Sequence, residues 1–482
     1  MNNQLNMLDA TFLYVETRRS PMHIAGLQIL DIPRDKRRVF FEELKRHIAA
    51  RAPSVAFMTR RLVTSPLDLD HPHWHTVDRL DIDHHVQRVL LPKPGSIAQM
   101  EQTVARLHAE PLDRSKPLWQ YYLIEGVEGT KAAWYTKMHH ACIDGVAGQT
   151  LLDIFGNPTP EDSPIRERAA DVAAPGTIER WTRAFTDSAL QPMKSFVTAT
   201  EALRSVGRLA RRALDGETFG AYALRVPRTR FNCVVGAQRS FTVGTLALSE
   251  VKAVGKTQDC KVNDVFLAVC AGGLRKYLDD LNELPAEPLI AGVPLSLREA
   301  GDQSLSNQVT MLLASLETHR TDPLARLTAI RDSALTGKAI AAATHRAMPQ
   351  DMHVLGMPIA MRWGMASMEA LRVADALPPP MNLIISNVPG PRHEVFIHGA
   401  RMLTHYPVSA PAHGNALNIT VQSYQDRLDF GITACRNALP DGAKLRDDML
   451  SAWHELKTLA LPATDTTTAV EREEFERQRS AA

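Results

Sequence analysis

Two adjacent histidines, His139 and His140, end a strand-like run and are followed by Asp144 and Gly145. A neutral imidazole titrates close to neutral pH, so it is the side chain best suited to take a proton from a hydroxyl or a thiol. Asp144 can orient an imidazole or pair with an arginine, and Gly145 allows the chain to bend sharply. The spacing predicts a general-base site in which one histidine acts as the base while its neighbour supports the loop.

Metal and thiolate chemistry are the alternatives for this segment. Zinc needs ligands that converge, whereas neighbouring side chains on a strand diverge, and no Cys-x-x-Cys or His-Glu-x-x-His pattern accompanies the pair. We therefore expect no metal here. Cys142 lies beside the apolar Ile143 and is more simply a packing residue than a nucleophile. In a chain with 18 histidines, two adjacent histidines are by themselves weak evidence for catalysis. The prediction therefore depends on the aspartate and glycine that follow them.

The histidines must be positioned by the strand that precedes them. A period of two divides residues 131–140 into two sides, which predicts a strand with His139 and His140 on opposite faces. Its expected partner covers 118–126, across a glycine-rich turn. The other elements expected in this half are a short opening helix, a strand at 23–30 and helices at 39–49, 97–107 and 149–155. The pattern indicates a mixed α/β domain.

The later part of the chain repeats this mixture. A strand is expected at 240–246 and a largely apolar, buried helix at 263–278, with Asn263 as its N-cap. Residues 383–385 predict a central strand that runs into a rigid turn, where Gly390 allows close approach to another segment. A hairpin is expected from 417–424 and 428–434. Four methionines share one face of a further helix, suited either to alkyl chains or to ordinary core packing: Met357, Met361, Met365 and Met368.

Composition excludes several classes of protein. The chain has 482 residues and a net charge of +1, which argues against a nucleic-acid-binding protein and favours two domains. Five scattered cysteines fit a reducing cytoplasm. We expect neither a signal peptide nor a spanning helix, so any membrane contact would be peripheral. A helix expected at 193–214 carries arginines on one face, which suits either solvent or an anionic surface: Arg204, Arg208, Arg211 and Arg212.

Several short motifs, taken with the histidine motif, resemble the bacterial wax ester synthase/acyl-CoA:diacylglycerol acyltransferase family along nearly the whole chain. These motifs are Leu8-Asp9-Ala10-Thr11-Phe12-Leu13, Pro111-Leu112-Asp113-Arg114-Ser115-Lys116-Pro117-Leu118-Trp119, Val262-Asn263-Asp264, Val293-Pro294-Leu295-Ser296-Leu297-Arg298 and Ser386-Asn387-Val388-Pro389-Gly390-Pro391. The family commonly has arginine where Lys116 stands. Lysine keeps the positive charge but lacks the planar guanidinium group.

The resemblance implies a two-domain α/β fold of the CoA-dependent acyltransferase type, as in chloramphenicol acetyltransferase, with a tunnel between the domains. It makes His140 the base, with Asp144 holding Arg298 and Asn263 near the reacting centre. The implied catalytic set is His140, His139, Asp144 and Asn263, and Gly145, Arg298 and Asp264 are its expected structural support. The side chains expected to contact the substrates are Glu16, Trp119, Ser386, Asn387, Met361 and Met365.

These expectations divide the chain into an acyltransferase domain at 1–155, a linker and helical crossover at 156–235, a second acyltransferase-like domain at 236–460 and a disordered tail at 461–482. The implied activity is transfer of a long-chain acyl group from acyl-CoA to a fatty alcohol or diacylglycerol, with no cofactor. The protein would be a cytoplasmic monomer or homodimer that touches a membrane or lipid droplet only peripherally. The alternatives are an acyltransferase that takes its acyl group from a carrier protein, or a non-catalytic protein that coats lipid droplets.

Overall fold

The computed structural model describes residues 3–143, 148–182, 226–296, 309–345 and 356–461. The helices of the first half are α1 (Met7–Val15), α2 (Phe40–Arg51), α3 (Ile82–His85), α4 (Ile97–Ala109) and α5 (Gly148–Phe155), with short 3-10 turns η1 (Ala52–Ser54), η2 (Ala56–Thr59) and η3 (Pro66–Asp68). Its strands are β1 (His23–Asp31), β2 (Arg60–Val63), β3 (His73–Thr76), β4 (Val86–Leu90), β5 (Trp119–Val127), β6 (Lys131–His139) and β7 (Gly156–Asn157).

The second half contains a similar mixture of elements. Its helices are α9 (Leu248–Thr257), α10 (Val262–Asp280), α11 (Pro323–His345), α12 (Met357–Ala370), α13 (Val373–Ala376) and α14 (Gly442–Ala460). Its strands are β8 (Arg239–Ala247), β9 (Ile290–Ser296), β10 (Val309–Ser315), β11 (Leu383–Val388), β12 (Phe396–Ile397), β13 (Ala400–Val408), β14 (Leu417–Tyr424) and β15 (Arg427–Cys435). The strands and helices predicted from the sequence within the described residues are confirmed, with ends that differ by at most three residues.

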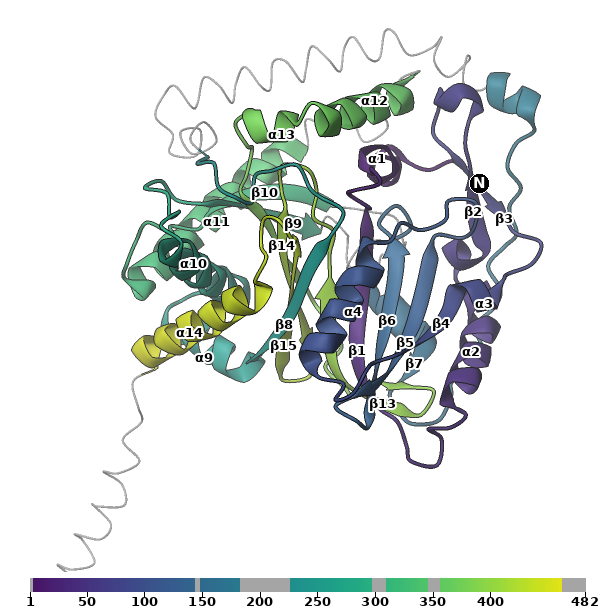
Figure 1. Ribbon diagram of the computed structural model, residues 1–482, viewed down its shortest axis with the longest axis horizontal. Helices are drawn as coiled ribbons and strands as arrows, with labels where there is room; N and C mark the ends of the chain where they lie inside the picture. The colour runs from purple at the N-terminus through teal and green to yellow at the C-terminus, as the bar shows by residue number, and fades with distance from the viewer. Residues whose placement is uncertain (1–2, 144–147, 183–225, 297–308, 346–355, 462–482) are drawn as a thin grey trace, which may run out of the picture.

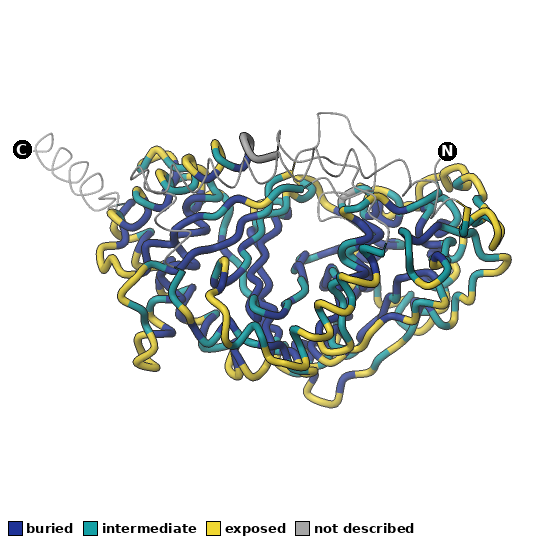
Figure 2. The backbone as a smooth tube through the Cα atoms, turned by 90° about the horizontal axis from the view of Figure 1, so that it is seen from above, coloured by how far each residue is buried: buried dark blue, intermediate teal, exposed yellow. Residues whose placement is uncertain are grey.

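The strands form two large sheets that stand side by side (Figure 1). Within the described residues, the first sheet has the order β4-β5-β6-β1-β13-β12-β7 and the second has the order β10-β9-β11-β14-β15-β8. β2 and β3 form a separate ribbon. Figure 2 shows that the central backbone of each half is buried, whereas the outer loops are exposed.

β6 has the predicted alternation of its two faces. Trp134 and Met138 pack in the core on one side of the sheet, under α1 and α2. Ala133 and Tyr135 pack in a second core on the other side, with residues of α4 and β8. Because both faces of β6 are covered, its apolar residues do not alternate with solvent-facing polar ones.

α4 lies between the two halves and has well-satisfied ends. Ser96 and Gln99 cap its N-terminus by exchanging hydrogen bonds with each other's backbone N–H groups. At its C-terminus the buried Lys137 ammonium of β6 donates to the Leu107 and Glu110 carbonyls at 2.8 and 3.0 Å. Burial lowers the pKa of Lys137 to about 8. α4 is thereby tied to the strand that carries the histidine pair.

In the second half, helices cover one face of the sheet. α10 is apolar around most of its circumference and is buried, as predicted, against α14 and the second sheet. The prediction of Asn263 as its N-cap is wrong, because the helix begins at Val262 and its N-cap is Lys261. Instead, Asp264 satisfies the helix start, since its carboxylate accepts from the Lys261 N–H at 2.9 Å. The predicted helix at 193–214 lies outside the described residues.

The two sheets do not follow a single division of the chain. β12 and β13 come from the second half, yet they join the first sheet, where β13 pairs with β1. β13 also packs against β14 and β15 of the second sheet. At this crossing a Cβ on Gly431 would lie 2.0 Å from the Pro407 carbonyl oxygen, so only glycine fits there. β13 therefore connects the two halves, since it belongs to the first sheet and packs against the second.

The predicted close approach at Gly390 is confirmed. A Cβ at this position would lie 1.8 Å from the Ser423 carbonyl oxygen, and the Gly390 N–H donates to the Ser423 hydroxyl at 2.9 Å. The turn after β11 is thus held against the end of β14. None of the helices in the described ranges is both long and apolar enough to cross a membrane.

Candidate active site

The histidine pair lies where β6 ends, and its backbone is anchored on both sides. The His139 N–H donates to the Leu118 carbonyl at 3.0 Å, just before β5. The His140 N–H donates to the Met22 carbonyl at 2.8 Å, just before β1. His139 itself pairs with His23 of β1 in the sheet register. The main chain is thus fixed at the point where the two side chains diverge.

The His139 ring has defined partners on both nitrogens. Its Nδ1 accepts from the Ala141 N–H at 3.0 Å, so the proton of the neutral ring must be on Nε2. Nε2 lies 2.7 Å from Glu16 Oε2 and donates to it. The side chain is only 1% exposed. His139 therefore holds the turn in place, and its hydrogen-bonding capacity is used within the protein.

Glu16 joins His139 to Arg114 of the Pro-Leu-Asp-Arg-Ser motif. Glu16 Oε1 accepts from Arg114 at 3.1 Å, and Oε2 also accepts from the Met22 N–H at 3.2 Å. Arg114 donates in addition to the Leu13 carbonyl of α1 at 2.9 Å. Burial alone would raise the pKa of Glu16, but the hydrogen bond and electrostatic attraction of the His139 ring, together with Arg114, lower it to about 2. Glu16 is therefore ionised at neutral pH.

His140 points to a different neighbour. Its ring stacks on Phe12 of α1, with ring centroids 3.9 Å apart and an angle of 5° between the planes. The residue is half-buried, in contrast to the fully buried His139. Phe12 thus supplies a flat apolar wall that fixes the plane of the imidazole. The two rings point in different directions, as the strand pattern predicts. The His139 ring is buried, and the His140 ring is only partly buried.

Three predicted members of the site lie outside the described residues: Asp144, Gly145 and Arg298. The pairing of Asp144 with Arg298 accordingly stays a prediction.

A second group of predicted residues meets in the other half of the molecule. Asn387 Nδ2 lies 3.4 Å from Asn263 Oδ1, which joins the end of β11 to the first turn of α10. Both amides line a cavity of about 470 Å³ that also includes Lys252, Ser296 and Arg392. β9, β11 and β14 run parallel to one another and end at this cavity. Ends of parallel strands are common ligand-binding positions in α/β folds.

The other predicted substrate contacts are dispersed. Trp119 is fully buried in the core, where its indole N–H donates to the Met58 carbonyl at 2.9 Å and its ring stacks on His85. Ser386 lies on β11 next to Asn387, outside the cavity lining. Met361 and Met365 are half-buried on α12, which packs against α1 (Figure 1). α12 therefore lies against the helix that carries Phe12, and Met361 packs on the core to which α1 contributes.

Sequence reasoning did not assign Arg114 and Phe12 to the site, although both stand in motifs that carried the family resemblance. The available signal was the presence of Arg114 and Phe12 in those motifs, since nothing in the sequence links Arg114 to Glu16, which stands 98 residues before it. Lys116, the departure from the family pattern, forms a single contact of 3.0 Å with Asp81 at the surface. An ammonium is sufficient for that contact.

Two family profiles match the chain. The first, described as the wax ester synthase/diacylglycerol acyltransferase catalytic domain, covers residues 5–266, and the second, described as the WS/DGAT C-terminal domain, covers 305–457. The chain belongs to this family. It is accordingly an O-acyltransferase, and the mixed α/β class expected from its sequence is confirmed.

Named relatives and solved structures agree with this assignment. The O-acyltransferase WSD of Acinetobacter baylyi is 33% identical over 440 residues, which are 90% of this chain and 93% of that protein. The structure of the wax ester synthase/diacylglycerol acyltransferase of Marinobacter aquaeolei VT8 matches with a TM-score of 0.69 and 27% identity, over 95% of this chain and 99% of that one. The first condensation domain of the calcium-dependent antibiotic synthetase matches in fold, with a TM-score of 0.55 at 12% identity over 95% and 96% of the two chains.

Proposed function

We propose that this enzyme transfers a long-chain acyl group from acyl-CoA to a fatty alcohol or diacylglycerol, with His140 as the general base. The observation that supports the choice of histidine is the network around His139. Because Ala141 and Glu16 engage both nitrogens of that ring, His139 is suited to positioning, and the half-buried His140 is suited to exchange protons with a substrate.

The proposed reaction begins when His140 takes the proton of the acceptor hydroxyl as its oxygen attacks the thioester carbonyl. The tetrahedral oxyanion then collapses, the carbon–sulfur bond breaks and the imidazolium returns the proton to the departing CoA sulfur. Asn263 is our proposed oxyanion donor, since its amide oxygen faces Asn387 Nδ2 and its NH₂ group is then the end that donates. The reaction needs no cofactor and no covalent enzyme intermediate.

The experiment that tests the function is a competition between acceptors. Purified enzyme is given one long-chain acyl-CoA with equal amounts of a fatty alcohol and a diacylglycerol, and the lipid products are identified. Formation of wax ester or triacylglycerol with matching release of free CoA is the expected result. Transfer only from an acylated carrier protein would favour the condensation-type alternative. Absence of transfer from both donors would overturn the proposed reaction.

The cavity beside Asn263 is our proposed site for the CoA moiety. Lys252 and Arg392 supply positive charge at its lining, which suits the phosphates of a nucleotide. Both side chains are exposed, so each contact with phosphate is worth at most about 1 kcal/mol. We expect Arg392→Ala to raise KM for acyl-CoA about fivefold while kcat is nearly unchanged. Steady-state kinetics over a range of acyl-CoA concentrations measures both values.

The matched control for this prediction is Lys256→Ala. Lys256 is an exposed lysine of α9 that does not line the cavity, so KM should stay at the wild-type value. An equal rise of KM in both variants would mean that only the overall charge of the protein matters. An unchanged KM in Arg392→Ala would place the CoA phosphates elsewhere.

We also propose peripheral membrane contact through α12 and α13, at the upper edge of Figure 1. Four large apolar residues are exposed there: Ile359 is 38%, Trp363 70%, Leu371 76% and Leu377 58% exposed. Tryptophan favours the interface between water and lipid. We expect Trp363→Ser to lower the fraction of protein that floats with phospholipid vesicles, by about threefold or more. Leu459→Ser, which changes an exposed apolar residue of α14, should leave flotation unchanged.

A further inference from the structure

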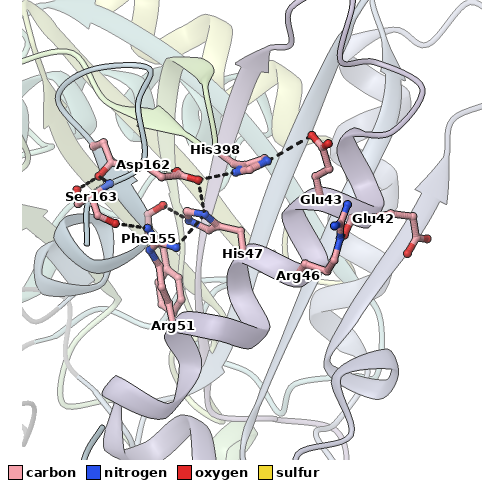
Figure 3. Close-up of polar contacts among 10 residues, drawn as sticks. Glu42, Glu43, Arg46, His47, Arg51, Phe155, Asp162, Ser163 and His398 are labelled. Atoms are coloured by element: carbon pink, nitrogen blue, oxygen red, sulfur yellow. Dashed lines mark hydrogen bonds and ion pairs between the residues drawn. The ribbon is translucent and has the colours of Figure 1, made fainter. Parts of the chain in front are cut away.

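Three segments that are distant in the sequence meet on the outer side of the first half, away from the histidine pair. α2 contributes Glu43 and His47, the segment after β7 contributes Asp162, and the turn between β12 and β13 contributes His398 (Figure 3). Three of these residues, His47, Asp162 and His398, have side chains that can bind a metal ion. Their ligand atoms lie within 4.8 Å of one another.

Both imidazole rings have their Nδ1 atom close to the same carboxylate oxygen of Asp162. Asp162 Oδ2 lies 3.3 Å from His47 Nδ1 and 2.9 Å from His398 Nδ1. In a tetrahedral zinc site with bonds of about 2.0 Å, neighbouring ligand atoms are separated by about 3.3 Å. The two separations from Asp162 Oδ2 are close to this value, and all three ligand atoms lie within 4.8 Å of one another, which leaves a position for a cation among them.

The far nitrogens of both rings supply an independent observation. His47 Nε2 donates to the Phe155 carbonyl at 3.0 Å, and His398 Nε2 lies 3.4 Å from Glu43 Oε2 (Figure 3). A histidine that binds a metal usually donates its other N–H to a carbonyl or carboxylate in this manner. The Phe155 carbonyl places the N–H of His47 on Nε2. With a cation among the three atoms, His398 would likewise donate from Nε2 to Glu43, and the lone pair of each Nδ1 would face the ion.

Burial and charge complete the description of the cluster. The His47 side chain is 2% exposed and Asp162 36%, so the cluster is fixed on one side and accessible from the other. Burial, with a smaller contribution from Arg51, lowers the pKa of His47 despite opposing contributions from the Phe155 carbonyl and Asp162. Arg51 Nη1 lies 3.2 Å from His47 Nδ1 and is the group that competes with a cation. Its other nitrogen donates to the Ser163 carbonyl at 2.6 Å, a contact that a bound ion would leave intact.

We propose that His47, Asp162 and His398 bind a zinc ion as a structural site, with Glu43 orienting His398. The ion joins a helix of the first half, the beginning of the crossover segment and a turn contributed by the second half. Its role is to fasten the crossover to the first sheet. Imidazole and carboxylate ligands suit Zn²⁺, which binds such sites more tightly than Mn²⁺, Fe²⁺ or Co²⁺.

The test uses full-length, untagged enzyme stripped of metal with a chelator. Zinc is titrated in by calorimetry, and the metal content after dialysis is measured by mass spectrometry. We expect one zinc per chain and a higher unfolding temperature, because a ligand that binds only the folded state stabilises it. Both readouts are independent of acyl transfer.

Variants assign the binding to the cluster. We expect His398→Asn and Asp162→Asn each to weaken zinc binding more than 100-fold, and Glu43→Gln to weaken it about 10-fold. Arg51→Gln should tighten binding, since it removes the competing charge. The control is His454→Asn, which replaces an exposed histidine of α14 and should bind zinc as the wild type does. Absence of zinc binding, or equal binding by wild type and both ligand variants, would reduce the cluster to a network of ion pairs and overturn the proposal.

Discussion

Replacement of His140 by alanine is expected to lower kcat by about 10²- to 10⁴-fold, the range typical for the loss of a general base. The ring is half-buried and stacks on Phe12, so its loss should reduce the free energy of unfolding by only about 1 kcal/mol. The measurement pairs release of free thiol from acyl-CoA, in the presence of a fatty alcohol, with urea unfolding of the same preparation.

His139→Ala is the matched comparison on the neighbouring residue. It removes a buried ring that bonds Glu16 and Ala141 and leaves the Glu16 carboxylate with one partner fewer, so we expect a loss of about 3 kcal/mol in stability as well as reduced activity. The two variants thus separate catalysis from support. Retention of more than a tenth of the wild-type kcat by His140→Ala would mean that another group takes the proton.

Glu16→Gln is expected to reduce stability by about 3 kcal/mol at neutral pH. The pKa of Glu16 is about 2 in the folded protein, against an ordinary value of 4.5, and each unit of difference corresponds to about 1.4 kcal/mol. Because the folded-state pKa is the lower one, the stabilisation is complete above pH 4.5 and is lost as the pH falls from 4.5 toward 2. The difference between wild type and variant should shrink over that range.

Urea unfolding between pH 3 and pH 7 measures this difference, and Glu128→Gln is its control. Glu128 pairs with Lys131 at the surface, where an ion pair contributes less than about 1 kcal/mol, so this variant should differ little from wild type at any pH. We expect Glu16 to act on catalysis through His139, so Glu16→Gln should lower kcat more than it raises KM. A pH-independent difference between Glu16→Gln and wild type would show that the carboxylate charge is not what stabilises the turn.

Much of the fold was predictable because it depends on local pattern. The alternation before His140 gave the strand and the opposite faces of the histidine pair, and the apolar circumference of α10 predicted its burial. The strand β13 was not predicted, since it includes His405 and Pro407 and has no clear alternation. His405 is buried, its backbone N–H donates to the Asp429 carboxylate, and Gly431 allows the neighbouring strand to approach Pro407. Such compensation between distant residues has no local signature.

Tertiary packing also explains why the N-cap of α10 and the position of Trp119 differ from the sequence predictions. Asn263 is a favourable N-cap residue, but tertiary packing starts the helix earlier, and the following Asp264 satisfies the end. Trp119 stands in a family motif, yet its indole is in the core. A motif identifies a residue as characteristic of the family without distinguishing contact with substrate from packing.

By itself the sequence determined the family, the mixed α/β class and a histidine pair able to act in proton transfer, because these depend on residue type and short-range spacing. Only the tertiary structure decided which histidine is held and which is presented. Glu16 and Arg114 approach His139 from other parts of the chain, and Phe12 supports His140. Hydrogen bonds and ring contacts depend on distances that folding alone creates, so the division of labour between two neighbouring, chemically identical side chains is a property of the folded chain.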